Sequence, residues 1–369
     1  MVTQLPNSAR ATITELDIWP VQQPGDKSTF VVIRLSTDAG VSGWGESMSG
    51  ADMTSATDNL SACRPLLIGE DALRREYIRK MLAQRANDGS QAALDMALVD
   101  ILGKLTQSPA HGVFGGPTRA KARAIALLTG DSESKLLASL SRSMQAGFRA
   151  ASVPILLPAG PTRGRQFYRQ TRELLDRMRD IAGDGMDFVL DCGATTTPAE
   201  AGVLASSLED FHLLWLDEPT GKIHEQGLST IAAEHATPIG WGRSATANGE
   251  FQNLLTQDAV DVLRPGITRL GMTQIRKAAA IAETYYVAVA PYNRGGPIGT
   301  AAALHVAAAI PNFFALEIPF PIEEADRRMR VGIGGEVESV TEGYCALPKG
   351  PGLGITVNVE VLEEYSIRS

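Results

Sequence analysis

From residue 122 onward, short apolar runs typical of β-strands alternate with longer runs typical of helices, at a spacing of about 25 residues. Eight runs fit this alternation as strands, at residues 123–129, 150–157, 187–193, 213–219, 238–244, 259–266, 286–293 and 313–319. A TIM barrel consists of eight β/α units, so this number favours a TIM barrel over an open doubly wound sheet. No G-x-G-x-x-G or P-loop motif opens a helix, which argues against a nucleotide-binding fold. The sequence therefore predicts an α/β protein whose residues 122–320 form a TIM-type barrel.

The rest of the chain predicts a second, α+β domain. Strand signals occur at residues 11–21, 29–35 and 41–46. The clearest helix signal covers residues 92–105, where the leucines and Ile101 fall on one face. From these elements we assign residues 1–121 to an N-terminal domain. Residues 321–369 carry strand and turn signals but are too few to fold alone, so they are expected to return to this domain and complete it.

Composition narrows the range of partners. The chain of 369 residues has a net charge of −8 and a pI of about 5.3, which argues against nucleic acid or an anionic membrane as a partner. No apolar run is long enough to cross a bilayer, and the first ten residues are too polar for a secretion signal. The three cysteines are scattered without metal-ligand spacing. We therefore expect a cytoplasmic protein with reduced thiols.

Two of the predicted strands end in a carboxylate that is followed at once by a turn former. Asp191 precedes Cys-Gly, and Asp217 precedes Glu-Pro. Because side chains alternate along a strand, both acids are expected to point to the same side at neighbouring strand ends. Glu218 has the opposite parity and is expected to face the surrounding helices.

A series of short motifs follows one order along nearly the whole chain. They are Gly43-Trp-Gly-Glu46, Ala93-Leu-Asp95-Met-Ala97-Leu-Val-Asp100-Ile, Gly115-Gly116, Gly147-Phe-Arg-Ala150, Asp191, Asp217-Glu-Pro219, Pro297-Ile-Gly299, Leu316-Glu317 and Pro351-Gly-Leu-Gly354. This order resembles the mandelate racemase/muconate lactonizing enzyme branch of the enolase superfamily. The resemblance implies a capping α+β domain whose loops close over a modified TIM barrel. It also implies a magnesium ion held by three acids on the third, fourth and fifth strands, and abstraction of a proton next to a carboxylate.

Several positions depart from the pattern that the resemblance implies. Ser152 and Pro154 stand at the lysine motif of the second strand, and neither side chain is an effective base by itself. Arg243 stands where the third metal ligand, a glutamate, is expected. An expected aspartate is Gly266, and an expected histidine is Tyr292. The sequence therefore predicts a divergent member that lacks most of the usual catalytic residues.

The signature positions of the family are only partly kept. Asp191 and Glu317 match the pattern, whereas Asp217 is one methylene shorter than the usual glutamate. A guanidinium at the third position would repel a divalent cation, and its planar fork suits two carboxylates. We therefore expect Arg243 to hold Asp191 and Asp217 together and expect no metal or other cofactor. If another residue supplies the third ligand, magnesium is the expected cofactor.

The predicted site residues follow from these positions. We predict Arg243, Tyr292, Lys222 and Glu317 as catalytic residues, and Asp191, Asp217, Ser152, Trp241 and Lys27 as substrate-binding residues. Tyr292 and Lys222 would transfer protons if a neighbouring cation or burial lowered their pKa values. Trp241 shares a face with Arg243, which makes it either a pocket wall or a core residue. Arg264 lies deeper in the barrel and is expected in a structural ion pair. An alternative for the whole charge cluster is that it only closes the end of the barrel.

Three functions remain open from the sequence. The leading hypothesis is a divergent isomerase or lyase that acts next to the carboxylate of a small acid, with Arg243 supplying the charge of the missing metal. The second is a catalytically silent protein that binds a small acid. The third is an ordinary magnesium-dependent racemase or dehydratase. In each case the expected partner is a small carboxylate molecule, and we expect a homo-oligomer.

Overall fold

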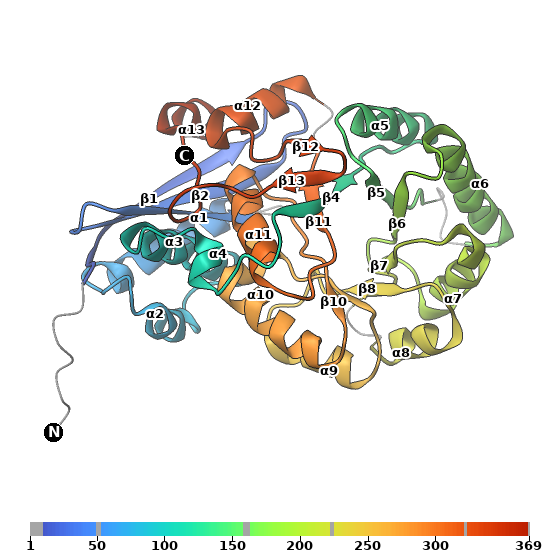
Figure 1. Ribbon diagram of the computed structural model, residues 1–369, viewed down its shortest axis with the longest axis horizontal. Helices are drawn as coiled ribbons and strands as arrows, with labels where there is room; N and C mark the ends of the chain where they lie inside the picture. Colours follow the sequence, from blue (N-terminus) through green and yellow to red (C-terminus); the bar gives the residue numbers. More distant parts are fainter. Residues whose placement is uncertain (1–9, 49–52, 158–162, 222–224, 321–322, 368–369) are drawn as a thin grey trace.

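The computed structural model describes residues 10–48, 53–157, 163–221, 225–320 and 323–367. An α+β cap and a barrel lie side by side, with the long helices α10 and α11 near the junction (Figure 1). This arrangement confirms the predicted fold, an α/β barrel with an N-terminal cap. Among the described residues, no helix is long and apolar enough to cross a membrane.

The cap is a three-stranded antiparallel sheet in the order β1-β2-β3, with helices against it. Its elements are β1 (Ile13–Gln22), β2 (Thr29–Thr37), β3 (Ser42–Met48), α1 (Met53–Leu67), α2 (Arg75–Leu82), α3 (Asp88–Leu105) and α4 (Ala110–Val113). Helix α3 packs closely on β3 because Gly43 and Gly45 have no side chain there. A Cβ atom at Gly45 would lie 1.9 Å from the carbonyl oxygen of Ala93, so only glycine permits this approach.

Each of the eight predicted barrel runs contains a strand. The strands are β4 (Lys121–Leu127), β5 (Ala150–Pro154), β6 (Asp187–Asp191), β7 (Leu216–Asp217), β8 (Ile239–Trp241), β9 (Val262–Leu263), β10 (Ala288–Val289) and β11 (Leu316–Pro319). Neighbours from β4 to β10 pair in parallel, and β11 pairs with β4. An isolated bridge between Val289 and Phe313 closes the ring. Most strands are shorter than predicted because the chain turns soon after the residues that reach the mouth of the barrel.

Helices surround the barrel, and apolar side chains fill its interior. The helices are α5 (Glu133–Gln145), α6 (Arg165–Ala182), α7 (Pro198–Ser207), η1 (Glu209–Phe211), α8 (Glu225–Glu234), α9 (Asn248–Thr256), α10 (Ile267–Thr284) and α11 (Pro297–Ala309). Inside the ring, a cluster contains Ile125, Ala150, Val189, Trp215, Val262, Ala290 and Ala315. Asp191 and Asp217 lie two residues beyond Val189 and Trp215 on the same faces, so the strand register points both acids into the mouth.

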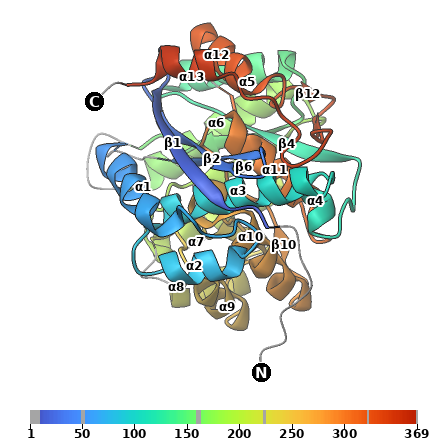
Figure 2. The same cartoon turned by 90° about the vertical axis from the view of Figure 1, so that its left-hand side faces the viewer.

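The C-terminal segment joins the two domains. It contains α12 (Glu324–Gly334), β12 (Val340–Thr341), β13 (Tyr344–Ala346) and α13 (Val359–Tyr365), which appear in red tones in Figures 1 and 2. Strand β13 pairs antiparallel with β4, while the N–H of Ile367 donates to the carbonyl oxygen of Pro20 on β1 at 2.8 Å. The segment thus contacts both the barrel and the cap.

The cap is also joined to the barrel through a buried carboxylate. Glu46 on β3 is fully buried and accepts the backbone N–H groups of Gly296 and Gly299, the latter at 3.2 Å. These amides lie at the start of α11, where helix N–H groups have no partner within the helix. Arg330 on α12 donates to the carbonyl oxygen of Gly295 at 2.7 Å. This junction lies directly behind Arg294.

Candidate active site

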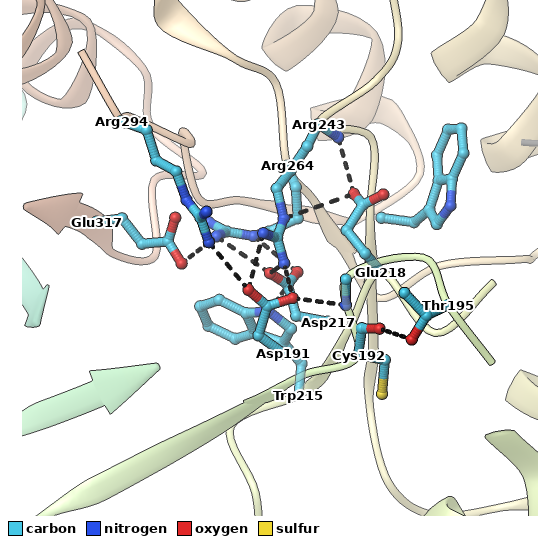
Figure 3. Close-up of polar contacts among 12 residues, drawn as sticks. Asp191, Cys192, Thr195, Trp215, Asp217, Glu218, Arg243, Arg264, Arg294 and Glu317 are labelled. Atoms are coloured by element: carbon cyan, nitrogen blue, oxygen red, sulfur yellow. Dashed lines mark hydrogen bonds and ion pairs between the residues drawn. The ribbon is translucent and has the colours of Figure 1, made fainter. Parts of the chain in front are cut away.

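One arginine joins two acids at the mouth of the barrel. Arg243 follows β8 and donates from Nη1 to Asp191 Oδ2 at 2.9 Å, and from Nη2 to Asp191 and to Asp217 (Figure 3). The side chains of Arg243, Asp191 and Asp217 are 10%, 4% and 0% exposed, so the pairs are largely shielded from water. The N–H of Gly193 also donates to Asp191 at 2.8 Å. These contacts fix both acids and the guanidinium in one arrangement.

The backbone at Gly242 determines where Arg243 points. Its φ of +132° interrupts the alternation of side chains at the end of β8, and such a conformation favours glycine. Trp241 therefore does not share the mouth with Arg243, as the strand pattern suggested. Its ring is buried in the main core outside the barrel interior, and its Nε1 donates to the carbonyl oxygen of Thr220 at 2.9 Å. The sequence left open whether Trp241 forms a pocket wall or belongs to the core, and in the structure it belongs to the core.

A second arginine lies beneath the first. Arg264 is fully buried, donates from Nε to Asp217 Oδ1 at 2.9 Å, and donates from Nη1 to the carbonyl oxygen of Ala290 at 2.6 Å. Its Nη2 lies 2.8 Å from Glu317 Oε1, which makes an ion pair, although the angles do not satisfy hydrogen bonding to either oxygen of Glu317. Glu317 has no exposed surface, so it lies below the mouth rather than at its surface. Arg264 forms the structural ion pairs that its depth in the barrel suggested.

A cavity of about 620 Å³ opens above this cluster, between the barrel and the cap. Its charged and phenolic wall residues are Asp88, Asp191, Glu218, Arg243, Arg269, Tyr292 and Arg294. Ser47 and Met48 on β3 form part of the cap side. Volumes of this size are typical of small-molecule sites.

Arg294 is a cation at this cavity that the sequence analysis missed. Its side chain is 41% exposed, and Nη2 lies 3.4 Å from Asp191 Oδ2, a long contact that leaves most of the guanidinium accessible. The ring of Tyr292 lies between two arginines, with its centroid 4.8 Å from Cζ of Arg243 and 5.6 Å from Cζ of Arg294. The sequence did contain a signal for Arg294, since this residue directly follows the end of a predicted strand and precedes a Gly-Gly pair.

Tyr292 is poorly suited to accept a proton at neutral pH. Burial raises the pKa of its phenol, and this effect outweighs the opposing effects of Arg294 and Arg243. The idea that its surroundings lower this pKa is therefore wrong. The phenol remains protonated near pH 7 and can donate a hydrogen bond into the cavity.

Glu218 also lines the cavity, although strand alternation predicted that it would face the surrounding helices. Its φ is +44°, which turns the chain away from regular strand geometry. Its Oε1 accepts the backbone N–H groups of Gly242 at 2.7 Å and of Arg243 at 2.8 Å. Burial, followed by the neighbouring charge of Asp217, raises the pKa of Glu218 to about 7. The sequence pattern could not show this because alternation assumes a regular strand.

Two of the predicted residues, Ser152 and Lys27, do not join this group in the structure. Ser152 is fully buried on β5, and no hydrogen-bond partner of its Oγ lies among the described residues. Lys27 is exposed, and its Nζ donates to the carbonyl oxygen of Pro24 at 2.9 Å. Its loop is fixed at α12, where Asp326 accepts the N–H of Gly25 at 2.6 Å. Neither Ser152 nor Lys27 lines the cavity. Lys222 lies outside the described residues.

Comparison with known proteins identifies the family. Residues 18–115 match the mandelate racemase/muconate lactonizing enzyme N-terminal domain, and residues 136–361 match the enolase C-terminal domain-like family. The chain belongs to the mandelate racemase/muconate lactonizing enzyme branch of the enolase superfamily. A mandelate racemase/muconate lactonizing enzyme-like protein from Rubrobacter xylanophilus has the same fold, with a TM-score of 0.88 and 23% identity over 97% of this chain and 98% of the other.

Several relatives of this enolase-superfamily protein are named as dehydratases. D-xylonate dehydratase from Haloferax volcanii is 29% identical over 92% of this chain and 85% of its own length. D-galactonate dehydratase from Pectobacterium atrosepticum is 26% identical over 91% of each chain. Family and relatives identify the chain as an enzyme of the isomerase or lyase type.

The family membership corrects one prediction. We expected no cofactor, but enzymes of this superfamily that act as dehydratases normally depend on magnesium, so this expectation is wrong. Asp191 and Asp217 offer the oxygen ligands that magnesium prefers. In the present arrangement they do not form a magnesium site, because the guanidinium of Arg243 lies between Asp191 and Asp217. Within the described residues, no group of three or more His, Cys, Asp or Glu side chains is arranged to hold a metal ion.

The position of Arg243 leads to a prediction about magnesium affinity. Replacement of Arg243 by Glu removes a cation and adds a third carboxylate, so we expect Mg²⁺ to bind at least about tenfold more tightly than to the parent. Isothermal titration of both proteins with Mg²⁺ measures the difference. Arg243→Gln removes the charge without adding a ligand and should lie between them. Equal affinities of all three proteins would show that Arg243 does not limit metal binding.

Proposed function

We propose that this protein is a lyase that removes water from a small polyhydroxylated acid. The observation that carries the proposal is the set of relatives along nearly the whole chain that are named as D-xylonate and D-galactonate dehydratases. The cavity supports the acidic character of the substrate, since Arg243 and Arg294 both line it. Guanidinium groups recognise carboxylates through paired, charge-assisted hydrogen bonds.

We assign different tasks to the residues at the mouth. Arg294 receives the substrate carboxylate, because it is the more exposed of the two arginines and has only a 3.4 Å contact with Asp191. Arg243 adds positive charge next to the carboxylate, where negative charge develops when a proton leaves the neighbouring carbon. The protonated phenol of Tyr292 donates a hydrogen bond to a substrate hydroxyl. Lys222, which lies outside the described residues, stays our candidate for the base.

The proposed function is tested with a panel of aldonic acids of four to seven carbons, incubated with enzyme and Mg²⁺ in deuterated water. A dehydratase gives a 2-keto-3-deoxy acid, which is detected by proton NMR and by its semicarbazone. Deuterium exchange at C2 without loss of water would identify an isomerase instead. Binding of an acid without exchange or product would contradict the assignment as an enzyme.

The assignment of Arg294 gives a second prediction. Arg294→Ala should raise KM for the acid by roughly 10- to 100-fold, because a charge-assisted hydrogen bond contributes about 1.5–3 kcal/mol. The free energy of unfolding should change little, since the side chain is 41% exposed. Arg327→Ala is a matched control, because Arg327 is similarly exposed at 45% but is paired with Glu324 on α12. An unchanged KM in Arg294→Ala would place the carboxylate elsewhere.

A further inference from the structure

A second cavity lies beside the one at the mouth of the barrel. Its volume is about 250 Å³, and its walls come from α2 and α3 of the cap, from α10, and from the loop at residues 246–248 that follows Arg243. Helices α3 and α10 lie side by side in both views (Figures 1 and 2). This cavity is small for an independent ligand site, since such sites usually have about 300–1,000 Å³. Its size is better suited to the extension of a larger site.

The two cavities meet at one pair of charged side chains. Asp88 at the start of α3 and Arg269 on α10 line both of them. Arg269 Nη1 lies 3.8 Å from Asp88 Oδ2, and the two side chains are 40–47% exposed. An ion pair that is so long and so accessible contributes little to stability. Asp88 and Arg269 can therefore separate when a ligand provides hydrogen bonds in place of their contact.

The walls of the second cavity suit hydroxyl groups. Gln91, Asn248 and Gln274 supply amide groups, which both donate and accept hydrogen bonds. Asn248 donates to Gln274 at 3.2 Å, but Asn248 Oδ1 and Gln274 Nε2 are buried without a partner among the described residues. A buried polar atom without a partner costs free energy, which a ligand hydroxyl can recover because it both donates and accepts. Leu94 and Leu98 provide the apolar surface that the C–H groups of a carbon chain require.

We propose that the second cavity is a subsite for the end of the substrate remote from its carboxylate, and that Asp88 and Arg269 form its entrance. The proposal rests on the proposed function, because it assumes that an acid binds at Arg243 and Arg294. It specifies the substrate class as a polyhydroxylated acid with a chain long enough to reach past Arg269. Shorter acids fill the mouth cavity only and gain no contact with the amide groups.

Isothermal titration of the parent protein with aldonic acids of four to seven carbons tests the proposal. Affinity should rise with chain length, by roughly tenfold once two further hydroxyl groups are bonded. In Gln274→Leu this rise should disappear, whereas binding of the four-carbon acid should remain within about twofold of the parent, because Gln274 does not line the mouth cavity. Arg269→Ala should also abolish the rise, and it removes a cation from the wall of the mouth cavity as well. Lys277→Ala is the matched control, because Lys277 on α10 pairs with Glu76 on α2 at 2.6 Å and lines neither cavity.

The outcomes separate this inference from the proposed function. Affinity that does not depend on chain length in the parent overturns the subsite, and so does an equal loss for all acids in Gln274→Leu. The same loss in Lys277→Ala would mean that Arg269 only joins the cap to the barrel, which also overturns it. Length-dependent binding that Arg269→Ala abolishes supports the subsite even if NMR finds no dehydration, and only the proposed reaction then fails.

Discussion

Replacement of Arg243 by Ala is expected to lower the free energy of unfolding by on the order of 3–5 kcal/mol at neutral pH, because it leaves two buried carboxylates without their common partner. Arg243 donates to both Asp191 and Asp217, which are at most 4% exposed. The variant should also lose binding of acidic ligands, since the cavity wall then carries uncompensated negative charge. Chemical denaturation and isothermal titration with an aldonic acid measure the two effects.

The loss in Arg243→Ala should depend on pH in a defined direction. Burial acts to raise the pKa of Asp191, but the charge and hydrogen bonds of Arg243 outweigh it and hold the pKa below the usual 3.8. A carboxyl with a lowered folded-state pKa contributes stability above the unfolded-state pKa, and this contribution is lost as pH falls through the folded-state pKa. The difference between parent and variant should therefore be largest near pH 7 and decrease toward pH 4 and below, roughly the range in which aspartates protonate.

A matched control for Arg243 exists on the surface. Arg172 also joins two aspartates, with 2.9 Å to Asp176 and 2.6 Å to Asp210, but its partners are 48% and 71% exposed. Arg172→Ala should cost at most about 1 kcal/mol, because water screens the charges. The double variant Asp191→Asn with Arg243→Met should be milder than Arg243→Ala, since only one carboxylate of the pair remains. Equal stability of Arg243→Ala and the parent would show that the cluster is not closed to water.

The largest loss of stability is expected for Arg264→Met. Arg264 has no exposed surface and separates two carboxylates that also have none, at 2.9 Å from Asp217 and 2.8 Å from Glu317. Methionine fills part of the volume but leaves Glu317 buried without its cation and leaves Asp217 with Arg243 alone, so we expect a loss of about 3–5 kcal/mol or a protein that does not fold.

A second change distinguishes lost charge from lost packing at Arg264. Glu317→Gln in the Arg264→Met background removes the charge that has lost its partner and should recover part of the stability. Thermal denaturation of the parent, both single variants and the double variant measures the coupling between the two positions. Additive effects would mean that packing, rather than charge, accounts for the loss.

The regular parts of the site were predictable from the sequence, and the irregular parts were not. Strand alternation places Asp191 and Asp217 together because β6 and β7 are regular and pair in register. The same rule fails at Trp241 and Glu218, because the positive φ values of Gly242 and Glu218 alter the direction of the chain at the strand ends. No local pattern encodes those angles, since they depend on the neighbouring strand.

Contacts between distant segments could not be predicted either. The loop with Lys27 is one example, because Asp326, some 300 residues later, accepts the amides of Gly25 and Asp26 and so fixes this loop at α12. The second cavity likewise requires the cap helices and α10 to be placed against each other before it exists. The raised pKa of Tyr292 could not be predicted for the same reason, because the burial that raises it arises only in the folded chain.

The carboxylate of Glu46 limits how the enzyme can admit a substrate. A rigid swing of the cap away from the barrel would break the hydrogen bonds of Glu46 with the amides of Gly296 and Gly299. These bonds favour access to the mouth by local loop or side-chain motion, with the cap sheet docked on the barrel. Because Gly296 and Gly299 closely follow Arg294, the same bonds hold the segment that carries the group we assign to the substrate carboxylate. The contact that docks the cap on the barrel thus also helps to position the site.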